Sequence, residues 1–240
     1  MTQQPFSAPS ATDSPQAAPP APSAATGGPV VAAQLAAFLA ARMCHDYISP
    51  AGAIMSGLDL LDDPSAQDMR QEAMDLIATS AKKLVAALAF DRVAFGSSAA
   101  AESFDTRQLE TLTRDVFAHV RAELEWAVIP PSLAKPAART LLNLAQVGIG
   151  ALPMGGVARM SAHEDRDATT VEMRATGARV RLRAEVQAGL NGQPLVEGLG
   201  GHWVQAYYLR QIIDDAGGAL ELLVAEDQIS VTVRLPVTIS

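Results

Sequence analysis

The residues best suited to chemistry stand together in one short segment, Cys44-His45-Asp46-Tyr47-Ile48-Ser49-Pro50, inside a run with helical periodicity. A neutral imidazole is a good nucleophile at cellular pH. Asp46 directly follows His45 and can reach its ring. An acid in that position fixes the tautomer, leaves the other ring nitrogen free and stabilises the positive charge that develops during attack. The segment therefore predicts a nucleophilic histidine with an orienting acid.

The helical pattern directs His45 away from the apolar side of its helix. At about 100° per residue, His45 lies about 180° from Ile54, which belongs to the apolar side. We therefore expect the imidazole to point toward solvent, where a core histidine would not be placed. Small residues on the same face leave space for another protein to approach the ring, namely Ser49, Gly52 and Ser56.

Pro50 stands inside the same helix. A proline in a helix interior costs about 3 kcal/mol and frees the carbonyl four residues earlier, here that of Asp46. We interpret the bend as part of the site, with Ser49 and Pro50 shaping the local helix. A surface histidine is usually only solvated, but the pattern His-acid-x-x-Ser/Thr/Asn-Pro occurs by chance on the order of once in a few hundred such chains. The pattern therefore favours a functional histidine.

Two long helices surround this segment. Apolar residues recur every three or four positions from Val30 to about Leu61, and again from Ser65 to about Phe95. The run Asp62-Asp63-Pro64-Ser65 predicts a turn, with Ser65 capping the second helix. A helical hairpin with an apolar seam is covered most simply by a second copy, so we expect a homodimer with a four-helix bundle. The predicted seam contains Met43, Tyr47, Ala51, Ile54, Leu58 and Leu61, then Met69, Ala73, Leu76, Ser80, Leu84 and Leu88.

Composition divides the chain into three parts. Residues 1–29, rich in Pro, Ala, Ser, Thr and Gly, predict a disordered tail. Residues 30–97 form the hairpin, and residues 98–240 form a second domain after a linker from Gly96 to Ser103. That domain is expected to contain helices 106–123, 137–152 and 203–216 and mostly antiparallel strands 125–129, 168–173, 220–224 and 229–235. Helices and strands in this order are typical of an α+β layer domain.

Composition also excludes several classes of function. A net charge of −8 without a basic stripe argues against nucleic-acid binding. A single cysteine, Cys44, excludes an internal disulfide and a Cys/His zinc site, and we expect it to be a small core residue of the bundle. No signal peptide and no membrane-spanning apolar run is present in the sequence. We therefore expect a cytoplasmic protein with no membrane association.

The segment His45 to Pro50 resembles the phospho-acceptor box of histidine kinases, in which a His-Glu/Asp pair precedes Thr/Ser/Asn-Pro. Longer runs, residues 45–70, 92–96 and 198–206, resemble the ChpT family of histidine phosphotransferases, from the alphaproteobacterial cell-cycle phosphorelay. The resemblance implies a hairpin that forms a dimeric four-helix bundle, followed by an α+β sandwich like a histidine-kinase ATP-binding domain. It further implies that a receiver-domain aspartate of a hybrid histidine kinase donates a phosphoryl group to His45. The phosphohistidine then passes it to aspartates of downstream response regulators, and Mg²⁺ is supplied by the partner receiver.

An active kinase domain is the main alternative. Histidine kinases carry an Asn-x-x-x-Asn box, and here Asn143 is followed four residues later by Val147, which cannot ligate Mg²⁺. An Asp-x-Gly-x-Gly loop is missing, and the glycine cluster 198–201 alone is a weak phosphate-binding signal. We therefore expect a phosphotransferase that binds no ATP and holds no metal or cofactor of its own. A non-catalytic dimeric adaptor is the other alternative.

The small residues around His45 define the expected docking face. We predict that a receiver contacts Ile48, Gly52, Ala53 and Ser56, and also Arg42, for which a plain surface charge is an equal alternative. The catalytic set is His45, Asp46, Ser49 and Pro50. The sequence does not identify the donor kinase, the acceptor regulators or the net direction of phosphoryl flow.

Overall fold

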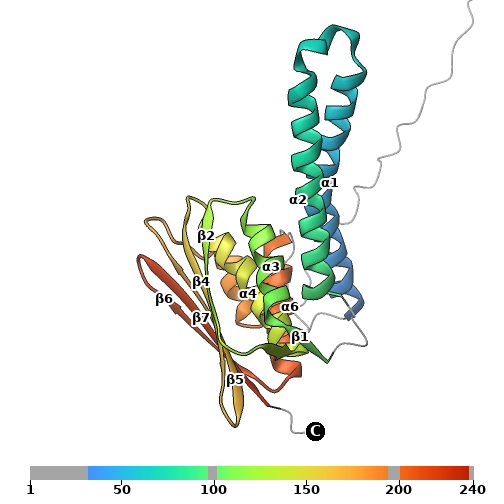
Figure 1. Cartoon of the computed structure of the whole chain (residues 1–240). Coiled ribbons are helices and arrows are strands. Elements are labelled where there is room, and N and C mark those ends of the chain that lie inside the picture. The colour runs from blue at the N-terminus through green and yellow to red at the C-terminus, as the bar shows by residue number, and fades with distance from the viewer. Residues whose placement is uncertain (1–31, 97–101, 194–200, 238–240) are drawn as a thin grey trace, which may run out of the picture.

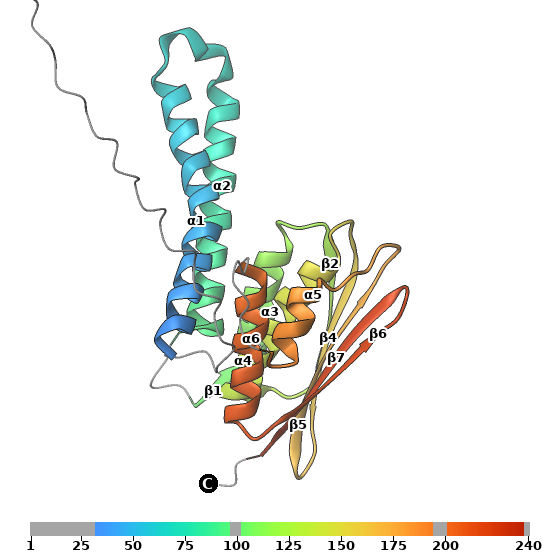
Figure 2. The same cartoon turned by 180° about the vertical axis from the view of Figure 1, so that it is seen from behind.

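A computed structural model describes residues 32–96, 102–193 and 201–237 of the chain. The predicted tail 1–29 and most of the predicted linker lie outside these residues. Helices α1, Ala32–Asp62, and α2, Arg70–Ala94, form an antiparallel hairpin that stands beside a layered α/β domain (Figures 1 and 2). The lower part of the hairpin lies against the helices of that domain, and its turn extends away from it. The predicted hairpin is therefore present as two long helices.

The hairpin turn contains a 3-10 helix, Pro64–Met69. Its cap is Asp63, whose carboxylate accepts hydrogen bonds from the backbone nitrogen of Ser65 at 2.8 Å and from its hydroxyl at 2.7 Å. The prediction that Ser65 is the cap is wrong. Pro64 lacks an N–H and suits the first helical position, which makes the aspartate before it the capping residue.

Helices α1 and α2 approach each other closely at Gly57, which is buried. A Cβ atom there would lie 2.6 Å from Cγ1 of Ile77 and 3.0 Å from the backbone oxygen of Ala73. The glycine is required because the two helix backbones approach each other at this point. Five of the six predicted seam residues of α1 are half-buried, namely Met43, Tyr47, Ala51, Ile54 and Leu61, and the sixth, Leu58, is exposed.

A second set of apolar residues on the hairpin is exposed in the single chain, except for two half-buried alanines, Ala51 and Ala81. On α1, Cys44, Ile48, Ala51, Met55 and Leu58 follow a spacing of four and three residues, and we call them the α1 apolar row. The α2 apolar row has the same spacing: Met74, Ala78, Ala81, Val85 and Leu88. Ile48 is 70% exposed and Val85 is 64% exposed. Cys44 is exposed in the single chain because α2 packs against a different side of α1, and its expected place in the core of a dimeric bundle stays a prediction.

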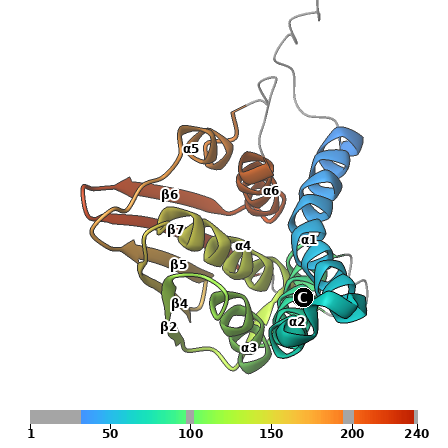
Figure 3. The same cartoon turned by 90° about the horizontal axis from the view of Figure 1, so that it is seen from above.

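The second domain has a five-stranded sheet with helices on one face, as Figure 3 shows from above. The strand order is β2-β4-β5-β7-β6, with β2 parallel to β4 and the other neighbours antiparallel. The strands are β2 Ala122–Val128, β4 Gly156–Glu164, β5 Ala168–Thr176, β6 Ala219–Val224 and β7 Gln228–Pro236. The helices are α3 Thr106–Phe117, α4 Lys135–Ala151, α5 Ala184–Leu190 and α6 Gly201–Asp215. Two short strands, β1 Ser103–Asp105 and β3 Ser132–Ala134, pair separately.

The predicted elements of this domain differ from the structure at several places, and the short strands β1 and β3 were not predicted. The predicted helix 106–123 ends at Phe117, and its last residues belong to β2, which pairs with β4 from Ala122 onward. Strand β4 was not predicted, because its inward residues include Ala158 and Ala162, and alanine has little preference for strands. Helix α5 was not predicted because it has only seven residues.

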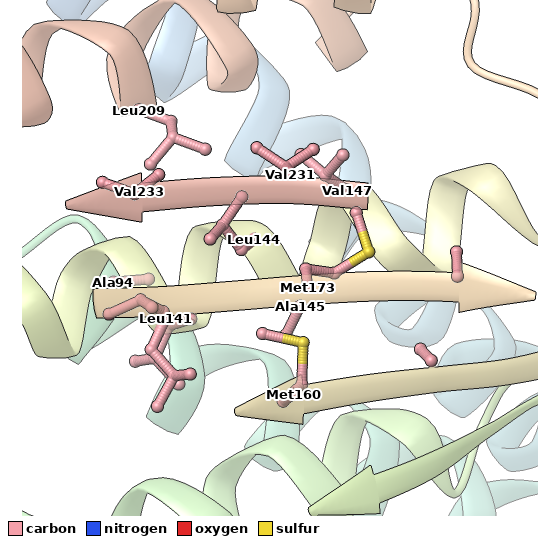
Figure 4. Packing of buried hydrophobic residues seen from close by; sticks show 14 of the residues in the cluster. Ala94, Leu141, Leu144, Ala145, Val147, Met160, Met173, Leu209, Val231 and Val233 are labelled. Atoms are coloured by element: carbon pink, nitrogen blue, oxygen red, sulfur yellow. The ribbon is translucent and has the colours of Figure 1, made fainter. Parts of the chain in front are cut away.

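Helix α4 lies at the centre of the domain core. Its Leu141, Leu144 and Ala145 lie over Met160 of β4 and Met173 of β5, as Figure 4 shows. A Cβ atom at Gly148 would lie 3.3 Å from the Met173 sulfur, so this helix sits directly on the sheet. The buried position of α4 fixes which of its residues can face the hairpin.

Candidate functional site

His45 lies on α1 with its side chain 86% exposed. Its Nδ1 is 3.3 Å from Oδ1 of Asp46. Among the described residues, Asp46 is the only hydrogen-bond partner of the ring, so Nε2 faces solvent. The predicted exposure of the histidine and its contact with the acid are therefore both present. An imidazole whose Nδ1–H donates to a carboxylate presents an unprotonated Nε2 as the nucleophile.

The surface next to His45 is open. Ser49, Gly52 and Ser56 are exposed, and a Cβ atom on Gly52 would meet nothing within 4 Å. Ala53 is half-buried beside them. The helix continues through Pro50, which is buried within it. Around Ser49, Gly52 and Ser56, the face that sequence spacing predicted for docking is therefore open in the described chain.

Arg42 does not belong to this open face. Its side chain is only 12% exposed. Nε donates to Oδ2 of Asp46 at 3.3 Å, and Nη2 donates to Oε1 of Gln146 on α4 at 3.2 Å. Arg42 therefore lies where the hairpin meets the second domain, between α1 and α4, and we call this region the domain joint. The Arg42 guanidinium also contacts Asp46, the acid next to the His45 ring.

A buried carboxylate, Asp91 of α2, lies in the same joint and is 7% exposed. The Tyr47 hydroxyl donates to its Oδ2 at 2.8 Å, and Nε2 of Gln146 donates to its Oδ1 at 3.5 Å. Burial raises the pKa of Asp91 above its ordinary value, against the opposing effect of the Tyr47 hydrogen bond and the Arg42 charge. Burial and the neighbouring Asp91 carboxylate together raise the pKa of Tyr47, so its hydroxyl stays protonated and can only donate to that carboxylate.

Three polar side chains of α4 face the hairpin, and we call them the α4 polar row: Arg139, Asn143 and Gln146. Arg139 donates to the backbone oxygen of Gly96. Asn143, fully buried, donates to the backbone oxygens of Ala94 at 3.3 Å and of Arg139 at 2.9 Å. Its own Oδ1 accepts from Gln205 of α6 at 3.4 Å. The row fixes the second domain to the end of α2.

Sequence reasoning did not find the roles of Asp91, Gln146 or Gln205. Asn143 drew attention only as a possible member of a kinase Asn box. Its spacing to Gln146 is three residues, and its spacing to Arg139 is four, so one face of α4 carries all three. That spacing could have indicated a polar face on α4. The sequence does not show that this face meets the hairpin, because that contact depends on the tertiary structure.

Comparison with known proteins decides the family. A family model for the C-terminal domain of histidine phosphotransferases matches residues 106–228. The protein phosphotransferase ChpT of Brucella abortus (strain 2308) is 34% identical over 199 residues, covering 82% of this chain and 93% of that protein. This chain belongs to the ChpT family of histidine phosphotransferases. The resemblance drawn from the sequence is confirmed, and so is a phosphotransferase activity in a phosphorelay at the level of the family.

Solved structures agree with the architecture of a ChpT-family protein. A bacterial phosphotransferase solved at 1.7 Å is 29% identical and gives a TM-score of 0.77, covering 86% of this chain and 98% of that one. The predicted order of a helical hairpin followed by an α/β sandwich is confirmed. The catalytic domain of histidine kinase ThkA is also similar, with 16% identity and a TM-score of 0.43, covering 56% of this chain and 93% of that domain.

In the part of the ChpT-family chain that the structure describes, neither a metal site nor a membrane-spanning helix is found. Within residues 32–96, 102–193 and 201–237, no group of three His, Cys, Asp or Glu side chains is placed to hold a metal ion. No helix of that part of the chain is long and apolar enough to cross a membrane. Residues 198–200 of the glycine cluster lie outside the described residues.

Proposed function

We propose that this chain relays phosphoryl groups between receiver domains, with Nε2 of His45 as the acceptor. The observation that carries the proposal is an 86% exposed imidazole whose Nδ1 is 3.3 Å from Asp46, next to an open face of small residues. Asp46 holds the proton on Nδ1 and leaves the Nε2 lone pair free to attack.

The transfer forms one bond and breaks one. Nε2 attacks the phosphorus of an aspartyl phosphate on the donor receiver, the Nε2–P bond forms, and the P–O bond to the aspartate breaks. The donor aspartate leaves as a carboxylate. The ring becomes a positively charged phosphoimidazole, and the Asp46 carboxylate stabilises that charge. Phosphoryl transfer depends mainly on positioning and on stabilisation of charge. A docked receiver would contribute Mg²⁺, which neutralises charge on the transferred phosphoryl group.

The donor is a hybrid histidine kinase, and the acceptors are response regulators, in which the same step runs in reverse onto an aspartate. The docking face includes Ser49, Gly52, Ala53 and Ser56. Because the face has no side chain at Gly52, a partner helix can approach the α1 backbone beside the ring. Gly52→Glu would project a charged chain into this space, so we expect it to block transfer and leave the dimer intact. Gly150→Glu is the matched control, since Gly150 is another exposed helical glycine with no atom within 4 Å of an added Cβ. Equal transfer by both variants would contradict the docking proposal.

The functional unit is a homodimer in which two hairpins form a four-helix bundle. The α1 and α2 apolar rows support it, because a spacing of four and three residues is the repeat that helices use to pack side by side. Ile48 and Cys44 lie in the α1 apolar row. We therefore assign Ile48 to the contact between copies, and not to the receiver contact predicted from the sequence.

The second domain binds no ATP in this proposal. The amide of Asn143 is occupied by Ala94, Arg139 and Gln205, and the residue four positions later is the apolar Val147. A calorimetric titration with Mg²⁺ and ATP is expected to show no binding heat. Saturable binding would favour the active-kinase alternative.

The decisive experiment follows ³²P from the charged receiver domain of a hybrid histidine kinase onto the wild-type chain and His45→Ala. His163→Ala is the matched control, because His163 is also exposed and lies far along the chain in β4. Acid-labile, alkali-stable label on the wild type and His163→Ala, but not on His45→Ala, is the expected result. Label on His45→Ala would overturn the assignment, and function that persists in cells carrying His45→Ala would favour the adaptor.

A further inference from the structure

The contact between His45 and Asp46 needs support from elsewhere in the molecule. Neighbouring residues of a helix point about 100° apart and do not face each other. Asp46 therefore reaches the ring in only some of its side-chain conformations, and its side chain is 45% exposed. A residue one turn away can restrict that choice, because side chains four positions apart lie on the same face.

Arg42 is that residue. The two oxygens of Asp46 are divided, with Oδ2 accepting from Arg42 at 3.3 Å and Oδ1 lying 3.3 Å from the His45 ring. Because the Arg42 side chain is only 12% exposed, its surroundings restrict its conformation more than those of a surface arginine. The guanidinium holds one oxygen of the acid and thereby turns the other toward the imidazole.

Gln146 fixes Arg42 in turn, and it comes from the second domain. Its Oε1 accepts from Nη2 of Arg42 at 3.2 Å, while Nε of the same guanidinium donates to Asp46. Its Nε2 reaches Asp91 at 3.5 Å, a longer and weaker contact. The bond to Arg42 is therefore the stronger of the two contacts that Gln146 makes.

The rest of the joint keeps Gln146 in place. Asn143, one turn earlier on α4, donates to the backbone of Ala94. On the other side, Trp203 and Tyr207 of α6 stack at 4.9 Å between ring centroids, and their cluster packs against Leu35, Phe38 and Leu39 of α1. The first part of α1 is thus held by the second domain until shortly before His45.

We propose that Gln146 is a positioning residue for phosphoryl transfer. Through Arg42 it orients Asp46, so that the second domain holds the His45 ring as the Nδ1–H tautomer. The inference rests on His45 being the acceptor. It gives the second domain a role in the reactivity of His45, beyond enlarging the docking surface.

The test compares Gln146→Met with Gln146→Glu. Methionine keeps the length and volume of the side chain but cannot accept from Arg42, whereas glutamate keeps the accepting oxygen. Gln71→Met is the matched control, because Gln71 is an exposed glutamine whose amide contacts only Asp75, at 3.1 Å. Two quantities are measured: the rate of label transfer from a ³²P-charged receiver domain, and the His45 tautomer from ¹⁵N chemical shifts of the unphosphorylated protein.

We expect Gln146→Met to slow transfer about 3- to 10-fold, the size that loss of a single hydrogen bond produces. Its His45 should shift from the Nδ1–H tautomer toward a mixture, while Gln146→Glu restores both quantities toward the wild type and Gln71→Met changes neither. Unchanged rate and tautomer in Gln146→Met would overturn the proposal. A slower rate with an unchanged tautomer in Gln146→Met would also overturn it, since Gln146 would then serve only the domain contact. Failure of the wild type to take label on His45 would instead contradict the proposed function, and the tautomer would still report on positioning.

Discussion

The hydrogen bond between Tyr47 of α1 and Asp91 of α2 offers a test of what stabilises the hairpin at the domain joint. Tyr47→Phe removes the hydroxyl that donates to Oδ2 of Asp91 at 2.8 Å and keeps the ring that packs beside it. The carboxylate is 7% exposed, so water replaces the lost donor poorly. In this variant the Asp91 carboxylate would still accept the hydrogen bond from the Gln146 amide, at 3.5 Å, and would still be near the positive charge of Arg42.

The expected cost follows from the charge of the acceptor. A hydrogen bond to a charged group contributes about 1.5–3 kcal/mol, so we expect the free energy of unfolding to fall by about 2 kcal/mol at neutral pH. The cost should shrink as the pH is lowered, because a protonated Asp91 accepts a weaker, neutral hydrogen bond. Burial raises the pKa of Asp91, so this protonation occurs at a higher pH than that of an exposed aspartate.

Urea unfolding followed by circular dichroism measures this cost, and a double-mutant cycle with Asp91→Asn isolates the pair. Tyr208→Phe is the matched control, since the half-buried Tyr208 hydroxyl makes no hydrogen bond to the described residues, and we expect it to change stability by less than about 0.5 kcal/mol. The reasoning would be refuted if the Tyr47 and Asp91 variants were additive within about 0.5 kcal/mol, or if Tyr208→Phe cost as much as Tyr47→Phe.

Three further predictions concern the hairpin and its joint. Gly57→Ala should destabilise the protein by about 1–3 kcal/mol in urea unfolding, because its methyl group would lie 3.0 Å from a backbone oxygen of α2. Gly52→Ala, its control on the open face, should stabilise by about 0.5–1 kcal/mol, and equal effects of the two would contradict the close approach. Val85→Glu places a charge in the α2 apolar row and should give a monomer by light scattering, whereas Thr79→Glu, exposed but outside the row, should stay dimeric; a dimeric Val85→Glu would contradict the bundle. Burial raises the pKa of Asp91 above its ordinary 3.8, so the native state binds more protons than the unfolded chain and stability falls as pH rises between the two pKa values. The unfolding free energy of Asp91→Asn minus that of the wild type should therefore increase from about pH 4 to neutral pH, and a constant difference would show that Asp91 does not titrate in this way.

Local patterns in the sequence predicted the hairpin and the surroundings of His45. Helical periodicity depends only on neighbours a few positions apart, so it located both long helices within a few residues. The same spacing placed His45 on the exposed side and the small residues beside it, as the structure has them. The four-residue spacing also brought Asp46 within reach of Arg42, although the sequence suggested that Arg42 lay on the open face.

Predictions failed where an element takes its conformation from a partner strand or helix. Strand β4 is rich in alanine and holds its extended form through pairing with β2 and β5 on both edges. Helix α3 ends earlier than predicted because the chain from Ala122 onward pairs with β4 as strand β2. Cys44 lies on a side of α1 that α2 does not cover, so its expected place in the bundle core depends on a second copy and stays a prediction.

The sequence by itself indicated the candidate nucleophile His45, the acid beside it and the helix that presents them, because these depend on neighbours within about one helical turn. Only the tertiary structure decided that α4 reaches the hairpin and that Gln146 contacts Arg42, across 104 positions of the chain. Contacts between such distant residues follow from how the helices pack against the sheet, and each is specified by the shape and volume of many side chains together. The acid beside His45 is a feature of sequence, while its orientation is a property of the folded domain pair.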